Sequence, residues 1–159
     1  MSAPDASDAK PRVRSASHFG VCVSDLERSV GFYRDVLEFA EVARLRFDDD
    51  GTRRLLDLPP EGVLEAVYLD RDGWRLELLH YPTPGSVPGD APRPMNRTGL
   101  THLSFVVDSL PDLAASIELH GGRILEETRL EGVVFALDPD GTRLELMTRP
   151  FDPATYAQR

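Results

Sequence analysis

A histidine and a glutamate recur as a pair in two stretches of this chain. His18 opens the apolar run His-Phe-Gly-Val-Cys-Val, and His102 opens the similar run His-Leu-Ser-Phe-Val-Val, 102 − 18 = 84 residues later. Glu77 ends the segment Asp-Gly-Trp-Arg-Leu-Glu, and Glu145 ends Asp-Gly-Thr-Arg-Leu-Glu, 145 − 77 = 68 residues later. Imidazole nitrogens and carboxylate oxygens are common ligands of divalent metal ions. If the two halves face each other, these four side chains predict one metal site.

The four side chains must be positioned by strands, because each lies in a short apolar run. Neighbouring residues of a strand point to opposite faces of the sheet. Both histidines and both glutamates therefore point away from the bulky leucine, valine and phenylalanine side chains on which helices would pack. The residues that we expect to share their face are Gly20, Cys22, Leu79, Ser104, Val106 and Met147.

These four side chains also admit a purely structural interpretation. A glutamate between two leucines is typical of the solvent side of a half-buried strand, and Arg75 or Arg143 could form an ion pair with it. A single histidine is more often the partner of a carbonyl or carboxylate, the role expected for His80 and His120. The same residue types at matching positions in both copies favour a metal site.

The periodicity predicts two β-α-β-β-β modules. In the first module a capping box at Ser24–Glu27 starts a helix, and in the second Ser109 caps a helix over 110–120 that Gly121 and Gly122 end. The expected strands cover 17–23, 40–47, 63–69 and 74–81 in the first copy, and 101–107, 123–129, 133–137 and 143–148 in the second. The first copy has surplus residues at 48–62, where we expect a loop over or beside the site.

The domain organisation follows from these elements. We expect a disordered leader at 1–16, one domain over 17–149 and a tail at 150–159. Within the domain, residues 17–81 form the first module, residues 82–100 a proline-rich linker, and residues 101–149 the second module. At 159 residues the chain has the length of a single domain.

Charge and composition exclude several functions. The net charge of −9 disfavours binding to nucleic acid, which needs clustered positive charge. No apolar run approaches the roughly 20 residues that a membrane helix requires, so we expect no membrane association. A single cysteine, Cys22, excludes an internal disulfide and favours a cytoplasmic location.

The His-apolar strand, the Asp-Leu-Glu-Arg-Ser-Val-Gly-Phe-Tyr helix and the Asp-Pro-Asp-Gly-x-x-Leu-Glu-Leu ending together resemble the vicinal oxygen chelate superfamily. This superfamily includes glyoxalase I, methylmalonyl-CoA epimerase, extradiol dioxygenases, and fosfomycin- and bleomycin-resistance proteins. The resemblance covers about residues 17–149. It implies an α+β fold in which two tandem βαβββ modules form an open, cup-shaped mixed β-sheet with helices outside, in a homodimer.

The resemblance also implies the site. It assigns His18, Glu77, His102 and Glu145 to one divalent ion (Zn, Ni, Co, Mn or Fe), with Glu145 as the main catalytic base and Glu77 as the second. This ligand set is most similar to bacterial glyoxalase I, although Cys22 stands where that enzyme normally has an arginine. Arg97 lies one residue from the expected place of another glutathione-contacting arginine.

The resulting functional hypothesis is a metal-dependent lyase or isomerase of the glyoxalase I or epimerase type. It would abstract a proton next to a carbonyl of a small-molecule substrate through an enediolate. Cys22, Arg97, Ser104 and Met147 are the predicted substrate contacts. The alternatives are a non-catalytic drug- or antibiotic-binding protein, and an Fe(II)-dependent dioxygenase. Whether the cup forms within one chain or between two stays open at this point.

Overall fold

The computed structural model describes residues 12–89 and 92–153; most of the expected leader and tail lie outside them. Each half has the predicted β-α-β-β-β order, with one additional short helix between the second and third strands of the first half. The first half contains β1 (Phe19–Cys22), α1 (Leu26–Asp35), β2 (Ala40–Phe47), α2 (Asp50–Leu55), β3 (Val63–Arg71) and β4 (Trp74–Thr83). The second half contains β5 (Leu103–Val106), α3 (Leu110–Leu119), β6 (Arg123–Leu130), β7 (Val133–Leu137) and β8 (Arg143–Met147).

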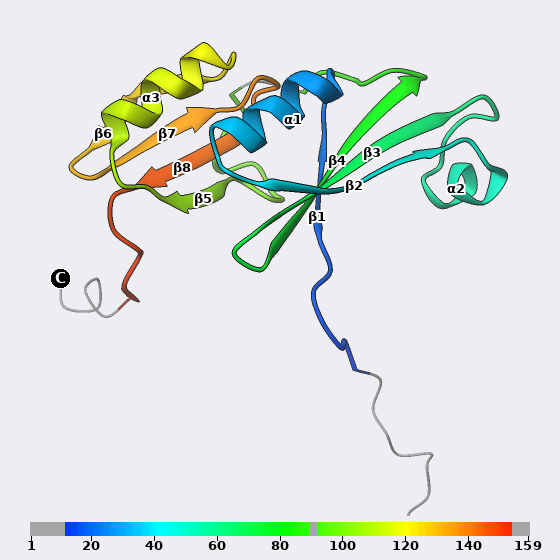
Figure 1. Ribbon diagram of the computed structural model, residues 1–159, viewed down its shortest axis with the longest axis horizontal. Coiled ribbons are helices and arrows are strands. Elements are labelled where there is room, and N and C mark those ends of the chain that lie inside the picture. Colours follow the sequence, from blue (N-terminus) through cyan, green and yellow to red (C-terminus); the bar gives the residue numbers. More distant parts are fainter. Residues whose placement is uncertain (1–11, 90–91, 154–159) are drawn as a thin grey trace, which may run out of the picture.

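The strands form two four-stranded mixed sheets that lie side by side (Figure 1). Their orders, β1-β4-β3-β2 and β5-β8-β7-β6, are equivalent. In each sheet the first strand runs parallel to the last, and the remaining neighbours are antiparallel. The α+β fold with tandem βαβββ modules is therefore confirmed, as two adjoining sheets.

The surplus residues 48–62 are partly helical. Asp49 caps α2 by accepting hydrogen bonds from the backbone N–H and the hydroxyl of Thr52. This short helix lies at the end of β2 and β3, far from the second sheet (Figure 1). A loop was expected here; instead, the Asp-Asp-Asp-Gly segment at 48–51 starts a short helix.

The helix starts agree only partly with the expected caps. Ser109 caps α3 as predicted, accepting from Asp112 N, and Gly121 ends the helix with a φ of +83°. In α1 the predicted capping box is wrong, because Asp25 is the cap and accepts from Arg28 N at 3.0 Å. The Ser24 side chain makes a contact with the second module instead. No helix of the described chain is long and apolar enough to cross a membrane.

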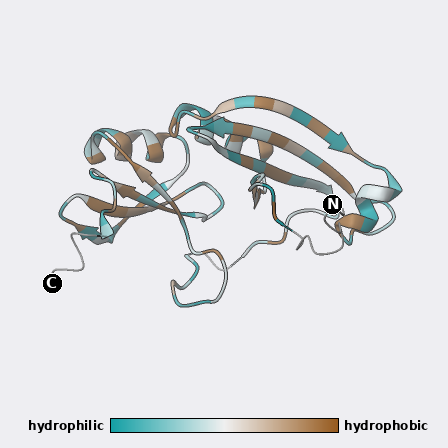
Figure 2. Ribbon diagram, turned by 90° about the horizontal axis from the view of Figure 1, so that it is seen from below, coloured by the Kyte–Doolittle hydropathy of each residue, from teal (hydrophilic) through white to brown (hydrophobic). Residues whose placement is uncertain are grey.

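The helices pack on one face of each sheet. Leu76 and Leu78 of β4, Leu144 and Leu146 of β8, and the helix residues Phe32, Tyr33 and Ile117 are all fully buried in one core. Hydrophobic and hydrophilic residues alternate along the strands (Figure 2). Because Glu77 and Glu145 lie between these leucines, they point to the helix-free face of their sheets.

A turn of the second module joins it to α1. This junction turn comprises residues 138–141. Asp140 accepts hydrogen bonds from the backbone and hydroxyl of Ser24 and from Arg28, whose Nη2 lies 2.7 Å from Oδ1. The buried hydroxyl of Tyr33 donates to Asp138 Oδ2 at 2.9 Å. Burial is the main reason why the pKa values of Tyr33 and Asp138 are both raised. The two modules of one chain are thus fixed to each other through α1.

Candidate functional site

The first predicted pair, His18 and Glu77, is brought together by neighbouring parallel strands. The register of β1 and β4 sets Gly20 opposite Glu77, and His18 immediately precedes β1. His18 Nε2 lies 3.1 Å from Glu77 Oε2. The Glu77 side chain is only 12% exposed, so this carboxylate has little contact with solvent.

Two hydroxyl groups orient this pair. Ser17 Oγ lies 3.0 Å from His18 Nδ1, which leaves Nε2 directed toward the carboxylate. The hydroxyl of Tyr68 donates to Glu77 Oε1 at 2.6 Å, and its ring lies edge-on to His18 at 5.6 Å. The hydrogen bond to Glu77, with burial, raises the pKa of Tyr68 to about 12. The tyrosine is therefore a neutral donor over the physiological pH range.

The second pair repeats this arrangement with different residues. His102 Nε2 lies 3.5 Å from Glu145 Oε2, and Thr101 Oγ1 lies 2.9 Å from His102 Nδ1. The ring edge-on to His102, at 5.5 Å, is Phe135, which has no hydroxyl. Ser104 on β5 donates to Glu145 Oε2 at 2.7 Å instead. Each histidine thus has a hydroxyl on Nδ1, and each glutamate has a hydroxyl donor.

The two glutamates differ in how firmly they are held. Both oxygens of Glu77 have partners, Tyr68 on Oε1 and His18 on Oε2. In Glu145 both contacts fall on Oε2, and within the described residues Oε1 has no hydrogen bond. The Glu145 side chain is also more exposed, at 25%. Of the two carboxylates, Glu145 is therefore the one with an oxygen that has no hydrogen bond to another described residue.

The four predicted ligands do not converge within one chain. Residues 12–89 and 92–153 contain no group of three or more histidine, cysteine, aspartate or glutamate side chains that could hold a metal ion. The chain presents two separate His–Glu pairs, one on each sheet. The four-ligand site stays a prediction, and it requires the two pairs to meet by some other route.

The predicted substrate contacts have different surroundings. Ser104 holds Glu145, as described, and Met147 lies two residues further along the same face of β8. Cys22 is exposed on β1, and its proximity contributes to the raised pKa of Tyr81, whose main cause is burial. Arg97 lies in the linker, where its carbonyl accepts from Arg93 Nη2. None of these contacts tests a role in substrate binding.

Apart from Ser104, the residues that orient the two pairs are absent from the predicted site. Ser17 and Thr101 each directly precede a predicted ligand, so the repeat itself contained that signal. Tyr68 and Phe135 are the cross-strand neighbours of Glu77 and Glu145, which only the register shows. The expected structural histidines contact carbonyls, His80 that of Val23 and His120 that of Ser116.

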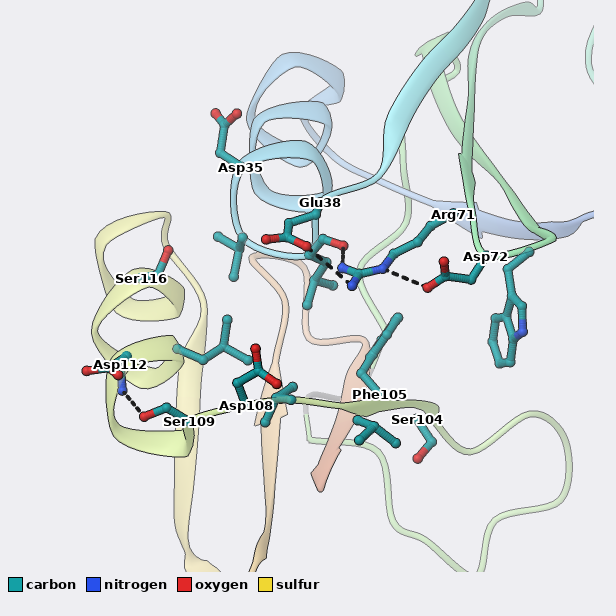
Figure 3. A pocket seen from close by; sticks show the side chains of 16 residues that line it. Asp35, Glu38, Arg71, Asp72, Ser104, Phe105, Asp108, Ser109, Asp112 and Ser116 are labelled. Atoms are coloured by element: carbon teal, nitrogen blue, oxygen red, sulfur yellow. Dashed lines mark hydrogen bonds and ion pairs between the residues drawn. The ribbon is translucent and has the colours of Figure 1, made fainter. Parts of the chain in front are cut away.

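A cavity of about 660 Å³ lies between the modules, and none of the four predicted ligands lines it. We call it the module cleft (Figure 3). Its walls are the end of α1, the β3–β4 turn, β5 and the start of α3. Arg71 crosses it toward Glu38 and Asp72, with Nη2 3.3 Å from Glu38 Oε2. On the opposite side lie Asp108, just before α3, and Asp112, in the first turn of α3.

The internal repeat explains why the module cleft is open. Ser24 and Arg28, which bind Asp140, correspond to Asp108 and Asp112 at the offset of 84. Asp140 itself corresponds to Asp72 at the offset of 68. One half of the module contact therefore sets donors against a carboxylate, whereas the other half has carboxylates in place of those donors. The like charges of Asp108 and Asp112 give Asp72 no donor across the cleft, and Asp72 pairs with Arg71 of its own module instead.

Comparisons with known proteins agree with this architecture. The model of the Glyoxalase/Bleomycin resistance protein/Dioxygenase superfamily matches residues 15–146. A glyoxalase family protein from Bacillus cereus is similar in structure, with a TM-score of 0.74 and 17% identity over 87% of this chain and 95% of that one. The trypanothione-dependent glyoxalase I of Leishmania major has a TM-score of 0.60 and 23% identity, covering 92% and 91% of the two chains.

A third similar structure is a variant of the fosfomycin resistance protein FosX from Listeria monocytogenes, in complex with Mn(II) and a dihydroxypropylphosphonic acid. It has a TM-score of 0.60 and 15% identity, covering 91% of this chain and 99% of that one. At these identities the structures show the fold alone, whereas the superfamily match extends over most of the sequence. This chain belongs to the Glyoxalase/Bleomycin resistance protein/Dioxygenase superfamily.

Proposed function

We propose that two copies of this chain together form divalent-metal sites. Each site would take His18 and Glu77 from one chain and His102 and Glu145 from the other. The observation that carries this proposal is the presence of two His–Glu pairs, each with a hydroxyl on the histidine Nδ1, on equivalent faces of separate sheets, in a chain that does not bring them together. A two-fold dimer would supply both halves twice, because its contact surfaces are self-complementary.

The residues fit a divalent ion. Metal-binding histidines usually have their second ring nitrogen held by a hydrogen bond, which fixes the ring and its tautomer. Ser17 and Thr101 hold Nδ1 of His18 and His102, and Nε2 is directed to a carboxylate in both. Two imidazoles and two carboxylates suit Zn, Ni, Co, Mn or Fe. The Mn(II) in the listerial FosX structure supports a metal in a protein of this fold.

We propose further that the protein is a lyase or isomerase that moves a proton next to a carbonyl group. A bound ion would supply Lewis acidity to the substrate oxygens. Glu145 accepts the proton, because its Oε1 has no other partner among the described residues. Ser104 keeps Oε2 in place while Oε1 takes up and returns the proton.

Glu77 has a more fixed role. Tyr68 and His18 occupy both of its oxygens, and its side chain is the less exposed of the two. It therefore acts mainly as an oriented ligand. It would become a second base only after losing the contact with one of these partners, and we accordingly expect Glu145 to dominate the proton transfer.

The test compares Glu145→Gln, Glu77→Gln and the control Glu65→Gln, a strand carboxylate that pairs with Arg46. Metal content is measured after reconstitution, together with turnover of hemithioacetals and acyl-CoA thioesters. We expect Glu145→Gln to keep most of its metal and to lose turnover by about a hundredfold or more. Glu77→Gln should lose metal, and the control should change neither quantity.

Three outcomes would contradict the proposal. Undiminished turnover in Glu145→Gln would remove its role as the base. A wild-type protein that stays monomeric yet binds the ion with full affinity would remove the shared site. A wild-type protein that takes up no divalent ion, but binds an apolar ligand in the presence of chelator, would favour the non-catalytic binding role.

A further inference from the structure

We propose that Arg143 binds an anionic group of the substrate, which makes the substrate a small organic acid with a carboxylate, phosphate or phosphonate. The inference rests on the proposed function and specifies the ligand class of the same site. Nε of Arg143 is buried and, among the residues that the structure describes, is the only buried side-chain nitrogen or oxygen without a hydrogen-bond partner.

The Arg143 guanidinium also forms no ion pair with any described residue. Its one hydrogen bond runs from Nη2 to the carbonyl of Arg93 at 3.2 Å, and no ion pair of Arg143 is formed within the described chain. A guanidinium has five N–H donors, so most of its capacity is unused. A buried donor without a partner is costly, and such a group in a folded protein requires an explanation.

The repeat provides an internal comparison for this arginine. Its counterpart in the first module is Arg75, at 143 − 68 = 75. Asp70 accepts two hydrogen bonds from Arg75, both at 2.6 Å. The corresponding aspartate of the second module is Asp138, which instead binds the Tyr33 hydroxyl and the backbone N–H groups of the junction turn and Thr142. The second module therefore has the equivalent arginine, but the equivalent aspartate does not bind it.

The position of Arg143 places this charge beside the second half-site. Arg143 and Glu145 are two residues apart on β8, so they share a face and their Cα atoms are separated by about 7 Å. The guanidinium carbon lies 5.2 Å from the centre of the Phe135 ring, the same ring that lies edge-on to His102. The stacking and the Arg93 carbonyl hold the cation in place next to Glu145.

These features select the ligand class. A planar guanidinium binds oxyanions through paired hydrogen bonds, and a stacked guanidinium is pre-organised to do so. The chain has a net charge of −9, so a local cation is needed to attract an acidic substrate. The short separation from Glu145 limits the substrate to one whose anionic group is a few bonds from the reacting carbon.

The experiment measures anion binding to the full-length, metal-free protein by calorimetry. Inorganic phosphate and acetate serve as probes, and their comparison separates phosphate-type from carboxylate preference. Arg143→Met keeps the packing over Phe135 and removes the charge, whereas Arg75→Met removes the paired arginine of the first module. We expect Arg143→Met to weaken binding of the preferred anion by about tenfold or more. Arg75→Met should bind it within about twofold of wild type.

The outcomes separate this inference from the proposed function. Arg143→Met should leave metal content unchanged, and with an active acidic substrate it should raise KM more than it lowers kcat. Anion binding by Arg143→Met equal to wild type, or no anion binding by wild type, would overturn the inference alone. A weakened dimer with unchanged anion affinity would show that Arg143 pairs with a carboxylate of the second copy. If Arg143→Met fails to fold, Arg143→Lys provides the test, because it keeps the charge but loses the paired geometry.

Discussion

Replacing Tyr33 with phenylalanine tests how the two modules are joined. The Tyr33 hydroxyl is fully buried and donates to Asp138 Oδ2 at 2.9 Å. The substitution deletes one oxygen and leaves the ring packing with Phe32 and Phe39 in place. Asp138 keeps its bonds from Asp140 N and Thr142 N, so only one of its partners is lost.

The expected cost follows from these contacts. A hydrogen bond to a charged group contributes about 1.5–3 kcal/mol. Both groups are buried and water does not replace the hydroxyl readily, so we expect Tyr33→Phe to lose about 2 kcal/mol. For a domain of this size that corresponds to a Tm lower by roughly 4–8 °C.

The effect has a defined pH dependence. Burial, with the neighbouring Asp138, raises the pKa of Tyr33 well above the ordinary value of 10.0. A group with a raised native pKa stabilises the fold fully below its unfolded pKa and loses that contribution as the pH rises beyond it. The difference between wild type and Tyr33→Phe should therefore be constant from pH 7 to about pH 9 and should shrink above pH 10.

Urea unfolding at several pH values measures this difference, with Tyr81→Phe as a control. The Tyr81 hydroxyl is partly buried but has no hydrogen bond to another described residue, so the control should change stability by less than about 0.5 kcal/mol. A loss below about 0.5 kcal/mol in Tyr33→Phe, or a difference that grows above pH 10, would refute the role given to this contact.

Two further predictions concern the module cleft and the ligand-orienting hydroxyls. Replacing Asp108 with Ser and Asp112 with Arg gives Asp72 the same donors that Asp140 has in the other half of the module contact. The free energy of unfolding, measured in urea, should therefore rise by about 0.5–1 kcal/mol. An unchanged or lower free energy of unfolding would contradict the charge explanation. Tyr68→Phe and Ser104→Ala should each weaken the binding of Mn(II) or Zn(II) by about tenfold to hundredfold, measured by competition with a chelator. Wild-type metal affinity in both variants would show that these hydroxyls do not orient the ligands.

Much of the site could be predicted because the repeat and strand parity act together. Two copies of the same histidine and glutamate, each between apolar residues, indicated both the residues and the face. The neighbouring strands then brought His18 to Glu77 and His102 to Glu145. Such pairings follow from order and register within one module, which local sequence largely determines.

Contacts between modules were not predictable in the same way. Asp70 and Asp138 occupy equivalent places in the repeat, yet one binds an arginine and the other a buried tyrosine of α1. Ser24 begins a capping-box pattern in the sequence. In the structure its hydroxyl donates to Asp140 of the junction turn, and Asp25 caps the helix. These outcomes depend on how two sheets approach each other, a long-range property with no periodic signature.

The position of the junction turn ties the joining of the modules to the chemistry. Asp138 and Asp140 are held by α1, and the same turn leads within a few residues into the strand that carries Glu145. Separation of the two modules would therefore disturb the turn from which the strand of the proposed base begins. The contact that holds the duplicated halves together and the strand that carries the proposed base are thus adjacent in the chain, so a change in one is transmitted directly to the start of the other.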